Sequence, residues 1–383
     1  MTALRVAYVI GTTAGGTGRH VAMLAEGCAG RGLTVSVFGP DSTRRLFPAV
    51  AFTAVDIAER PRPVRDTAAV LRLRRLLAGC APDVVHAHGV RAGAAAVLAL
   101  TGAARRRRPA LTGAARGHRP ALQVTVHNMA PSGTVSGPVY LGLERLIARR
   151  ADAVLCVSAD LAGRMRRAGA RDVALAVVPA PAAPPPSAEA VGKARADMGA
   201  SGRPIVFAAG RLAPQKGFDV LLEAMTRLQG REPVPLLVIA GDGPMAGQLA
   251  ARSRATRADV RFLGQRADIP ALLAAADVAV VPSRWEGQPL IVQEALRAGR
   301  PLIASRVGGI PGLTGEAALL IPANDPVRLA SALASVLDEP AQSGRLAEAA
   351  LARARTLPSQ SDAIDAAIAG YAGLAARTGP GSA

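Results

Sequence analysis

The sequence is poor in cysteine, in aromatic residues and in lysine. Its three cysteines, Cys28, Cys80 and Cys156, stand far apart and outside any CxxC arrangement, so neither a disulfide framework nor a zinc site is indicated. Aromatic residues make up only 3% of the chain, too few for the stacking surfaces that bind single-stranded nucleic acids. We therefore expect a protein of the reducing cell interior with no nucleic-acid partner.

Long apolar runs are missing as well. The longest mainly apolar stretch without charge, residues 92–104, is shorter than the roughly 20 residues that a membrane span needs. The N-terminal apolar run at residues 4–10 leads into a glycine-rich loop, which fits a first β-strand better than a signal peptide. We expect a cytoplasmic protein, with peripheral attachment at the inner face of the plasma membrane as an open alternative.

The sequence is strongly basic, with a net charge of +18 from 46 Lys+Arg and 28 Asp+Glu. Only Lys193 and Lys216 are lysines, and the arginines accompany abundant alanine and glycine, as in a GC-rich coding sequence. Hydrophobic residues reach 50% and the mean hydropathy is +0.24, which indicates a large core. The positive charge therefore carries less functional information than its size suggests.

Short β-branched runs alternate with longer amphipathic segments in two halves of the chain. This pattern predicts α/β architecture with two doubly wound Rossmann-like domains, whose strand-end loops face a ligand cleft. We predict an N-terminal domain at 1–180, a proline-rich linker at 181–200, a C-terminal domain at 201–360, and a helix and tail at 361–383 that packs back on the first domain. The expected strands lie at 6–10, 34–38, 84–87, 123–126, 153–157 and 173–178, and then at 205–209, 236–240, 260–263, 278–281, 302–304 and 318–321.

Residues 100–121 contain a tandem duplication. The segment from Leu100 to Ala110 is followed by a near copy from Leu111 to Ala121, and the first copy carries the run Arg105–Arg108. Clusters of basic residues can bind anionic lipid headgroups, but insertions into surface loops cost little. We favour a tolerated insertion, and an anionic membrane surface remains a candidate partner of this basic loop.

Three loops carry candidate chemistry at strand ends. The first holds Gly15-Gly16 and leads into a helix that we expect to begin near Arg19; glycines there allow close approach to a phosphate or sugar. The second runs from Gly210 to Gly217 and carries Arg211 and Lys216, two cations that suit a diphosphate. The third holds Glu286 and Gly287, and Pro289 suits the first position of a helix whose free amides near Leu290 and Ile291 favour an anion. Glu294, two turns on, is placed to reach a ribose.

Together these loops resemble the GT-B glycosyltransferases, in particular the large family 4 of retaining enzymes. The resemblance covers about residues 5–330 and rests on several motifs in family order. They are Gly15-Gly16-x-x-Arg19-His20, Asp83-Val-Val-His86-Ala-His88-Gly89, Thr125-Val-His127, Gly210-Arg211-Leu212-x-x-x-Lys216-Gly217, Gly241-x-Gly243-Pro244, Glu286-x7-Glu294 and Val307-Gly308-Gly309-Ile310-Pro311.

The resemblance implies a retaining hexosyltransferase whose first domain binds the acceptor and whose second binds the nucleotide-sugar donor. The donor would be a UDP- or GDP-sugar; the acceptor is unidentified, with lipid-linked, cell-envelope and secondary-metabolite precursors as candidates. Roles follow for the catalytic candidates: Arg211 and Lys216 would neutralise the diphosphate, Glu286 would hold sugar hydroxyls, and His127 would lie near the anomeric carbon. The donor would further be bound by Gly16, Gly210, Gly243, Gly287, Leu290, Ile291 and Glu294.

No metal or other cofactor is expected. Asp-x-Asp, the usual metal–diphosphate motif of the other major glycosyltransferase fold, is absent, and His86 and His88 share a strand face without an apparent third ligand. Two other functions stay open at this point. One is a nucleotide-sugar epimerase on the same scaffold, and the other is a basic protein that binds membranes or nucleic acids through the arginine loop.

Overall fold

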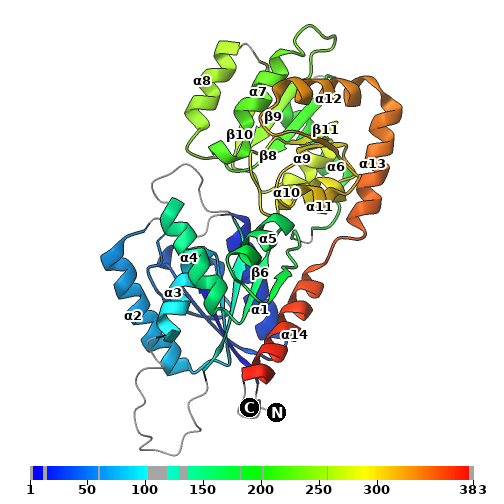
Figure 1. The fold of residues 1–383 in the computed structure, drawn as a ribbon. Coiled ribbons are helices and arrows are strands. Elements are labelled where there is room, and N and C mark those ends of the chain that lie inside the picture. Colours follow the sequence, from blue (N-terminus) through cyan, green and yellow to red (C-terminus); the bar gives the residue numbers. More distant parts are fainter. Residues whose placement is uncertain are drawn as a thin grey trace, which may run out of the picture. The chain divides into compact units, whose positions relative to one another are not determined.

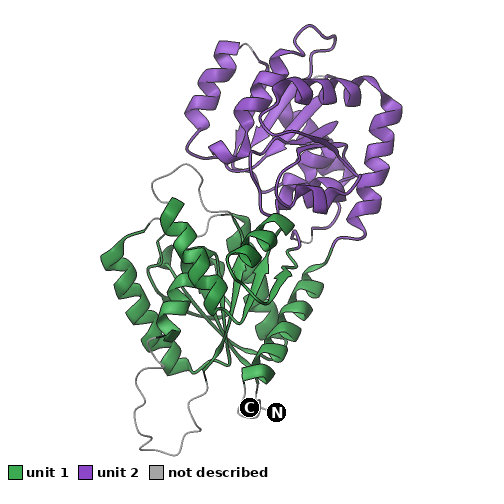
Figure 2. Cartoon of the chain, in the orientation of Figure 1, with its two compact units in different colours: residues 1–178, 358–383 green, residues 179–357 purple. Residues whose placement is uncertain are grey.

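A computed structural model of the chain describes residues 3–11, 15–58, 61–101, 119–128, 137–181, 183–200, 202–256 and 258–378. Residues 102–118, which hold most of the duplicated segment and the Arg105–Arg108 run, lie outside the described residues. The chain forms two compact units, residues 1–178 with 358–383 as unit 1, and residues 179–357 as unit 2 (Figure 2).

Unit 1 is built on a parallel seven-stranded sheet with the order β3-β2-β1-β4-β5-β6-β7. Its strands are β1 (Arg5–Ile10), β2 (Thr34–Gly39), β3 (Ala51–Ala54), β4 (Val84–His88), β5 (Ala121–Val126), β6 (Ala153–Cys156) and β7 (Val173–Leu175). Its helices are α1 (Gly16–Gly30), the 3₁₀ helix η1 (Asp41–Leu46), α2 (Pro63–Cys80), α3 (Val90–Thr101), α4 (Gly137–Arg150), α5 (Ala159–Arg167) and α14 (Gln360–Thr378).

Unit 2 repeats the plan with a parallel six-stranded sheet in the order β10-β9-β8-β11-β12-β13. Its strands are β8 (Ile205–Ala209), β9 (Leu236–Ala240), β10 (Val260–Gly264), β11 (Val278–Val281), β12 (Leu302–Ser305) and β13 (Leu319–Ile321). Its helices are α6 (Ala188–Met198), the 3₁₀ helix η2 (Pro214–Lys216), α7 (Phe218–Thr226), α8 (Ala246–Thr256), α9 (Ile269–Ala275), α10 (Leu290–Arg297), α11 (Ile310–Thr314), α12 (Pro326–Asp338) and α13 (Pro340–Ala354). Among the described residues, no helix combines the length and apolar character needed to cross a bilayer.

Both faces of the second sheet are covered by helices, which explains the apolar strand sequences. Ile205 and Phe207 of β8 belong to one buried cluster, with residues of α6 and α9, whereas Val206 and Ala208 belong to another, with residues of α7 and α12. A strand buried on both faces must be apolar at every position. This is why the short runs were readable from the sequence.

The winding of each unit reverses at one place in its sheet. In unit 1 the chain builds outward from β1 in one direction and from β4 in the other, and in unit 2 it does so from β8 and β11. Ligands of doubly wound sheets bind at the carboxyl ends of the strands flanking such a reversal. The fold therefore singles out the loops after β1, β4, β8 and β11.

At the opposite edge of each sheet, the amino edge where the strands begin, aspartates bind the backbone of neighbouring strands. An aspartate directly before a strand accepts a hydrogen bond from an amide at the start of the neighbouring strand, and so satisfies a donor that the ladder leaves over. The pairs are Asp83 with the amide of Arg5 at 2.8 Å, Asp152 with that of Leu122 at 2.7 Å and Asp277 with that of Ile205 at 2.7 Å. Acidic residues at this edge thus have a structural task.

The structure differs from the sequence-based expectations in four places. Strand β3 was not predicted because it is short, lies at the sheet edge and is only partly buried. The predicted linker 181–200 contains helix α6, whose Ala194 and Met198 are buried in the core of unit 2. Helix α1 begins at Gly16 rather than near Arg19, and Pro289 is the N-cap of α10 rather than its first residue.

The C-terminal helix α14 belongs to unit 1 and lies beside α1 (Figure 1). Its Tyr371 is fully buried, and its hydroxyl lies 2.8 Å from that of Tyr8 in β1 and 2.6 Å from Nδ1 of His86 in β4. Nε2 of His86 lies 2.7 Å from the Thr125 hydroxyl. A buried chain of hydrogen bonds therefore ties α14 to three strands of the sheet.

We predict that Tyr371→Phe lowers the free energy of unfolding by about 1–3 kcal/mol, because it leaves Nδ1 of His86 and the hydroxyl of Tyr8 buried without this partner. Urea titration followed by circular dichroism measures the change. Thr67→Ala, which removes an exposed hydroxyl bonded only within α2, is the control and should change stability by less than about 0.5 kcal/mol. A Tyr371→Phe protein as stable as the parent would contradict the assigned role of this chain of bonds.

Candidate functional site

The loop after β8 passes directly against the end of β11. It turns through Gly210 and Arg211, forms the short helix η2, and reaches Gly217 in a left-handed conformation with φ 64°. A Cβ atom on Gly217 would lie 2.1 Å from the carbonyl oxygen of Pro282, which is too close for any side chain. Glycine at this position therefore brings Lys216 beside the loop that carries Glu286.

Lys216 and Glu286 form an ion pair between the two loops. The ammonium of Lys216 donates to Oε1 of Glu286, and only 5% of the Glu286 side chain is exposed to solvent. A buried carboxylate requires such partners, because leaving it unpaired would cost several kcal/mol. Each of the two charges is thus compensated by the other.

Two further donors hold the carboxylate. The hydroxyl of Ser283 donates to Oε1 at 2.8 Å, and the side-chain amide of Gln215 donates to Oε2 at 3.3 Å. The backbone is fixed too, because a Cβ on Gly308 would lie 1.7 Å from the carbonyl oxygen of Glu286. Three donors leave about one of the four acceptor positions of the carboxylate open.

Arg211 stands in contrast to Lys216. Its side chain is exposed and forms no ion pair with any residue that the structure describes. The backbone around it is held in place, since the amide of Gly210 donates to the carbonyl of Ala240 and Gly243 lies against the backbone of Leu212. Arg211 therefore offers a free cation on a rigid strand-end loop.

Helix α10 directs open amides toward the same edge of the sheet. Within the described part of the chain, the amide of Val292 bonds to the carbonyl of Pro289, while those of Leu290 and Ile291 make no backbone hydrogen bond. Such amides at a helix start favour an anion. The loop before the helix is fixed by a bond of 2.9 Å from the amide of Gly309 to the carbonyl of Gly287. Glu294 lies in the second turn and is partly exposed.

The two remaining predicted residues belong to unit 1. Gly16 is the first residue of α1, the helix that follows β1 in the chain. His127 follows β5, is 8% exposed, and places Nε2 3.1 Å from Nδ1 of His88 at the end of β4. Both therefore lie at the carboxyl edge of the first sheet, as predicted from their positions in the sequence.

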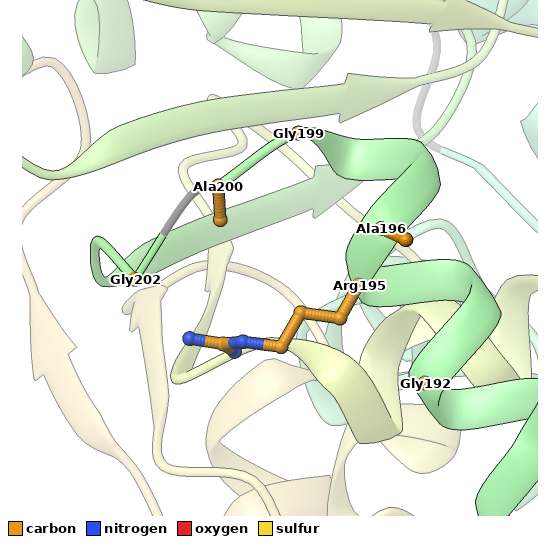
Figure 3. Close-up of a pocket in the computed structure, with 6 residues that line it drawn as sticks. All are labelled: Gly192, Arg195, Ala196, Gly199, Ala200 and Gly202. Atoms are coloured by element: carbon orange, nitrogen blue, oxygen red, sulfur yellow. The ribbon is translucent and has the colours of Figure 1, made fainter.

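A hollow of about 420 Å³ beside α6 does not belong to these strand-end loops (Figure 3). Its lining turn, Gly199–Gly202, leads into the start of β8, at the amino edge of the sheet. Arg195 is the only charged side chain in the lining, and it already binds the carbonyl of Ala275 at 2.7 Å and the carboxylate of Asp277 at 3.3 Å. We assign this hollow no ligand.

Comparison with known families agrees with this geometry in both units. Residues 14–182 match the model described as Glycosyltransferase Family 4, and residues 203–339 match that described as Glycosyl transferases group 1. The chain belongs to glycosyltransferase family 4. Its fold is the GT-B fold of that family: the structure of Anabaena HepE in complex with UDP-glucose aligns over 97% of this chain and 100% of that one, with a TM-score of 0.80 at 18% identity.

Curated relatives of this family 4 chain match over part of their length. Glycogen synthase of Mycobacterium tuberculosis is 38% identical over 151 residues, which are 38% of this chain and 36% of the relative. D-inositol 3-phosphate glycosyltransferase of Corynebacterium glutamicum is 37% identical over 169 residues, 40% of this chain and 39% of the relative. The alignments thus span less than half of either relative.

One residue of these strand-end loops that the sequence analysis missed is Arg284. It donates to both carboxylate oxygens of Asp219 at 2.9 and 2.7 Å, to the carbonyl of Pro214 at 2.6 Å and to Oδ1 of Asn324 at 2.7 Å. Burial would raise the pKa of Asp219, but the bonds from Arg284 outweigh it and lower that pKa. Arg284 therefore fastens the Lys216 loop to the Glu286 loop. Nothing in the sequence indicated this role, because arginine is common throughout the chain.

Four histidines also come together in unit 1, of which the sequence analysis had placed only His127 in the site. They are His20, His86, His88 and His127, with ring centroids of neighbouring members 4.0–6.3 Å apart. Burial lowers the pKa of His20 to about 4 and that of His127 to about 3, and it lowers those of His86 and His88 well below the usual value. Among the described residues no group of three or more His, Cys, Asp or Glu is arranged to hold a metal.

These shifts predict a loss of stability in mild acid. The unfolded chain binds a proton on each histidine below pH 6.5, whereas the folded chain resists until the much lower native pKa. Stability is therefore full above pH 6.5 and falls as the pH decreases toward 4. Between pH 7.5 and 5.5 we expect a loss of about 1 kcal/mol for each buried histidine. Urea titrations at a series of pH values measure this loss. The slope of the unfolding free energy against pH gives the number of protons taken up on unfolding, and His20→Phe should lower that number by about one. An unfolding free energy that stays constant over this range would contradict the prediction.

Proposed function

We propose that this chain transfers a hexosyl group from a nucleotide diphosphate sugar, with UDP and GDP as candidate nucleotides, to a hydroxyl of an acceptor, with retention at the anomeric carbon. In this reaction the bond between C1 of the sugar and the diphosphate oxygen breaks, and its electron pair stays on the diphosphate. The acceptor oxygen forms the new bond to C1, and its proton passes to the departing diphosphate. The products are the glycoside and the nucleoside diphosphate.

The observation that carries the proposal is the set of groups at the reversal point of unit 2. Arg211 is a free cation, Lys216 is a second cation within hydrogen-bonding reach of Glu286, and Leu290 and Ile291 present open amides. Positive groups that face the leaving oxygens stabilise the charge that develops on a diphosphate as the glycosidic bond breaks. The assignment needs no metal ion, because two cations and a helix start supply the compensation.

Glu286 and Glu294 are assigned to the sugar and the ribose of the donor. The remaining acceptor position on the carboxylate of Glu286 suits a sugar hydroxyl, and the position of Glu294 two turns into α10 suits a ribose hydroxyl beside a diphosphate at the helix start. His127 is assigned to the acceptor side in unit 1, as are the neighbouring strand ends. That Anabaena HepE, a structural neighbour of this chain, is in complex with UDP-glucose supports a nucleotide-sugar donor here.

The transfer is tested with a donor selected by thermal shift from UDP-glucose, UDP-galactose, GDP-mannose and ADP-glucose, since a ligand that binds the native state raises Tm. Release of nucleoside diphosphate from that donor measures activity. We expect Lys216→Ala and Glu286→Ala to reduce turnover at least 100-fold, because each removes one half of the ion pair and a proposed contact to the transition state.

Lys193→Ala is the matched control. Lys193 is the only other lysine, is exposed, and pairs with Asp197 on the same helix, so the variant should turn over as the parent does. Circular dichroism confirms that each variant is folded. Unchanged turnover in the Lys216 and Glu286 variants would contradict the assigned roles, and an isomerised donor without free diphosphate would favour an epimerase.

A further inference from the structure

Unit 1 concentrates the histidines of the chain at one end of its sheet. The sequence contains five histidines, and four of them form the cluster of His20, His86, His88 and His127. His20 lies in the first turns of α1, His86 and His88 in β4, and His127 after β5. These elements begin or end at the carboxyl edge of the sheet, where the acceptor side was assigned.

The hydrogen bonds of the cluster are incomplete. Both nitrogens of His86 have partners, Tyr371 and Thr125, and Nδ1 of His88 pairs with Nε2 of His127. Nδ1 of His20 and Nε2 of His88 have no hydrogen-bond partner within the described part of the chain. Yet only 5% of His20 and 2% of His88 is exposed. Buried polar atoms without a partner are costly and rare, so two in one cluster indicate a ligand that supplies the missing bonds.

The cluster carries no charge. Among the residues described, His86, His88 and His127 form hydrogen bonds only with uncharged groups, namely a tyrosine, a threonine, the Gln123 amide or another imidazole. Burial lowers the pKa of all four rings, so they are neutral at pH 7.

We propose that His20, His88 and His127 bind hydroxyl groups of an uncharged, polyhydroxylated acceptor such as a sugar, a glycoside or a cyclitol. This inference rests on the proposed function and names the acceptor class for it. A hydroxyl both donates and accepts, so it completes either tautomer of His88 and of His20. A phosphate or carboxylate only accepts, and burying it beside neutral rings would leave its charge uncompensated.

The two unpartnered nitrogens also give His20 and His88 a role distinct from that of His86. His86 is held on both sides by the protein, and so is a structural member of the cluster. His20 and His88 each keep one nitrogen for the ligand, and His88 orients His127 through the bond of 3.1 Å. His88 is therefore both an acceptor-binding residue and a positioning residue for His127.

The experiment measures release of nucleoside diphosphate from the donor selected above, with and without acceptors. The neutral panel consists of glucose, mannose, methyl glucoside, sucrose and myo-inositol, and the charged panel of glucose 6-phosphate, mannose 6-phosphate, glucuronate and inositol 1-phosphate. We expect at least one neutral acceptor to raise the rate tenfold or more over slow hydrolysis by water, and its charged counterpart to have no effect.

Substitutions in the histidine cluster test whether these residues bind the acceptor. His20→Phe and His88→Phe should each raise the KM of the neutral acceptor about tenfold or more and leave the KM of the donor unchanged. His88→Gln, whose amide both donates and accepts, should restore part of the affinity. His118→Phe, at the fifth histidine, which lies outside the described residues and every motif, is the control and should leave the acceptor KM unchanged.

The outcomes separate this inference from the function on which it rests. If no donor yields nucleoside diphosphate under any condition, the proposed function is wrong. If the donor is hydrolysed but only charged acceptors, or no neutral one, stimulate release, the acceptor class is wrong. The inference is also overturned if the His20 and His88 variants keep the parental KM, since the two nitrogens would then be filled by water alone.

Discussion

The ion pair between Lys216 and Glu286 is the interaction around which the site of unit 2 is organised. It exists because a doubly wound sheet places the ends of β8 and β11 next to each other, and because Gly217 allows the loops that follow them to approach within backbone contact. Gly308, after β12, likewise lies against the backbone of Glu286. The pair has to be held rigidly, since a buried carboxylate that lost its partner would destabilise the fold. Ser283, Gln215 and Arg284 provide that support. A site held in this way requires little reorganisation when a charged donor arrives, which is the condition for electrostatic catalysis.

In each sheet, polar residues at the amino edge stabilise the fold, whereas those at the carboxyl edge form the candidate site. At the amino edge, Asp83, Asp152 and Asp277 accept hydrogen bonds from strand amides. At the carboxyl edge, the polar groups are either free, as in Arg211, or bound to each other across loops. The carboxyl edge of unit 2 carries Arg211 and Lys216 and suits a diphosphate, whereas that of unit 1 holds a cluster of neutral imidazoles, which suits hydroxyl groups. In the proposed function, unit 2 accordingly binds the donor and unit 1 the acceptor.

Much of this could be predicted from the sequence, for physical reasons that differ between elements. Strands such as β8 and β9 are buried on both faces and so appear as uninterrupted apolar runs, whereas the edge strand β3 lacks that signal. Lys216 was visible because lysine is rare in this chain. Arg284 was hidden among many arginines, and the partnership of His20 with His88 depends on two elements far apart in sequence. Tyr371 could not be anticipated, since its partners precede it by hundreds of residues.

The claim that unit 2 binds a diphosphate through its strand-end cations is tested most directly by calorimetric titration of the protein with the nucleoside diphosphate of its donor. Arg211→Ala should weaken this binding tenfold or more, because it removes the one cation in the loop with no internal partner. Arg227→Ala, which removes an exposed arginine at the end of α7 in the same unit, should bind as the parent does. Equal affinity of the parent and Arg211→Ala would contradict the account.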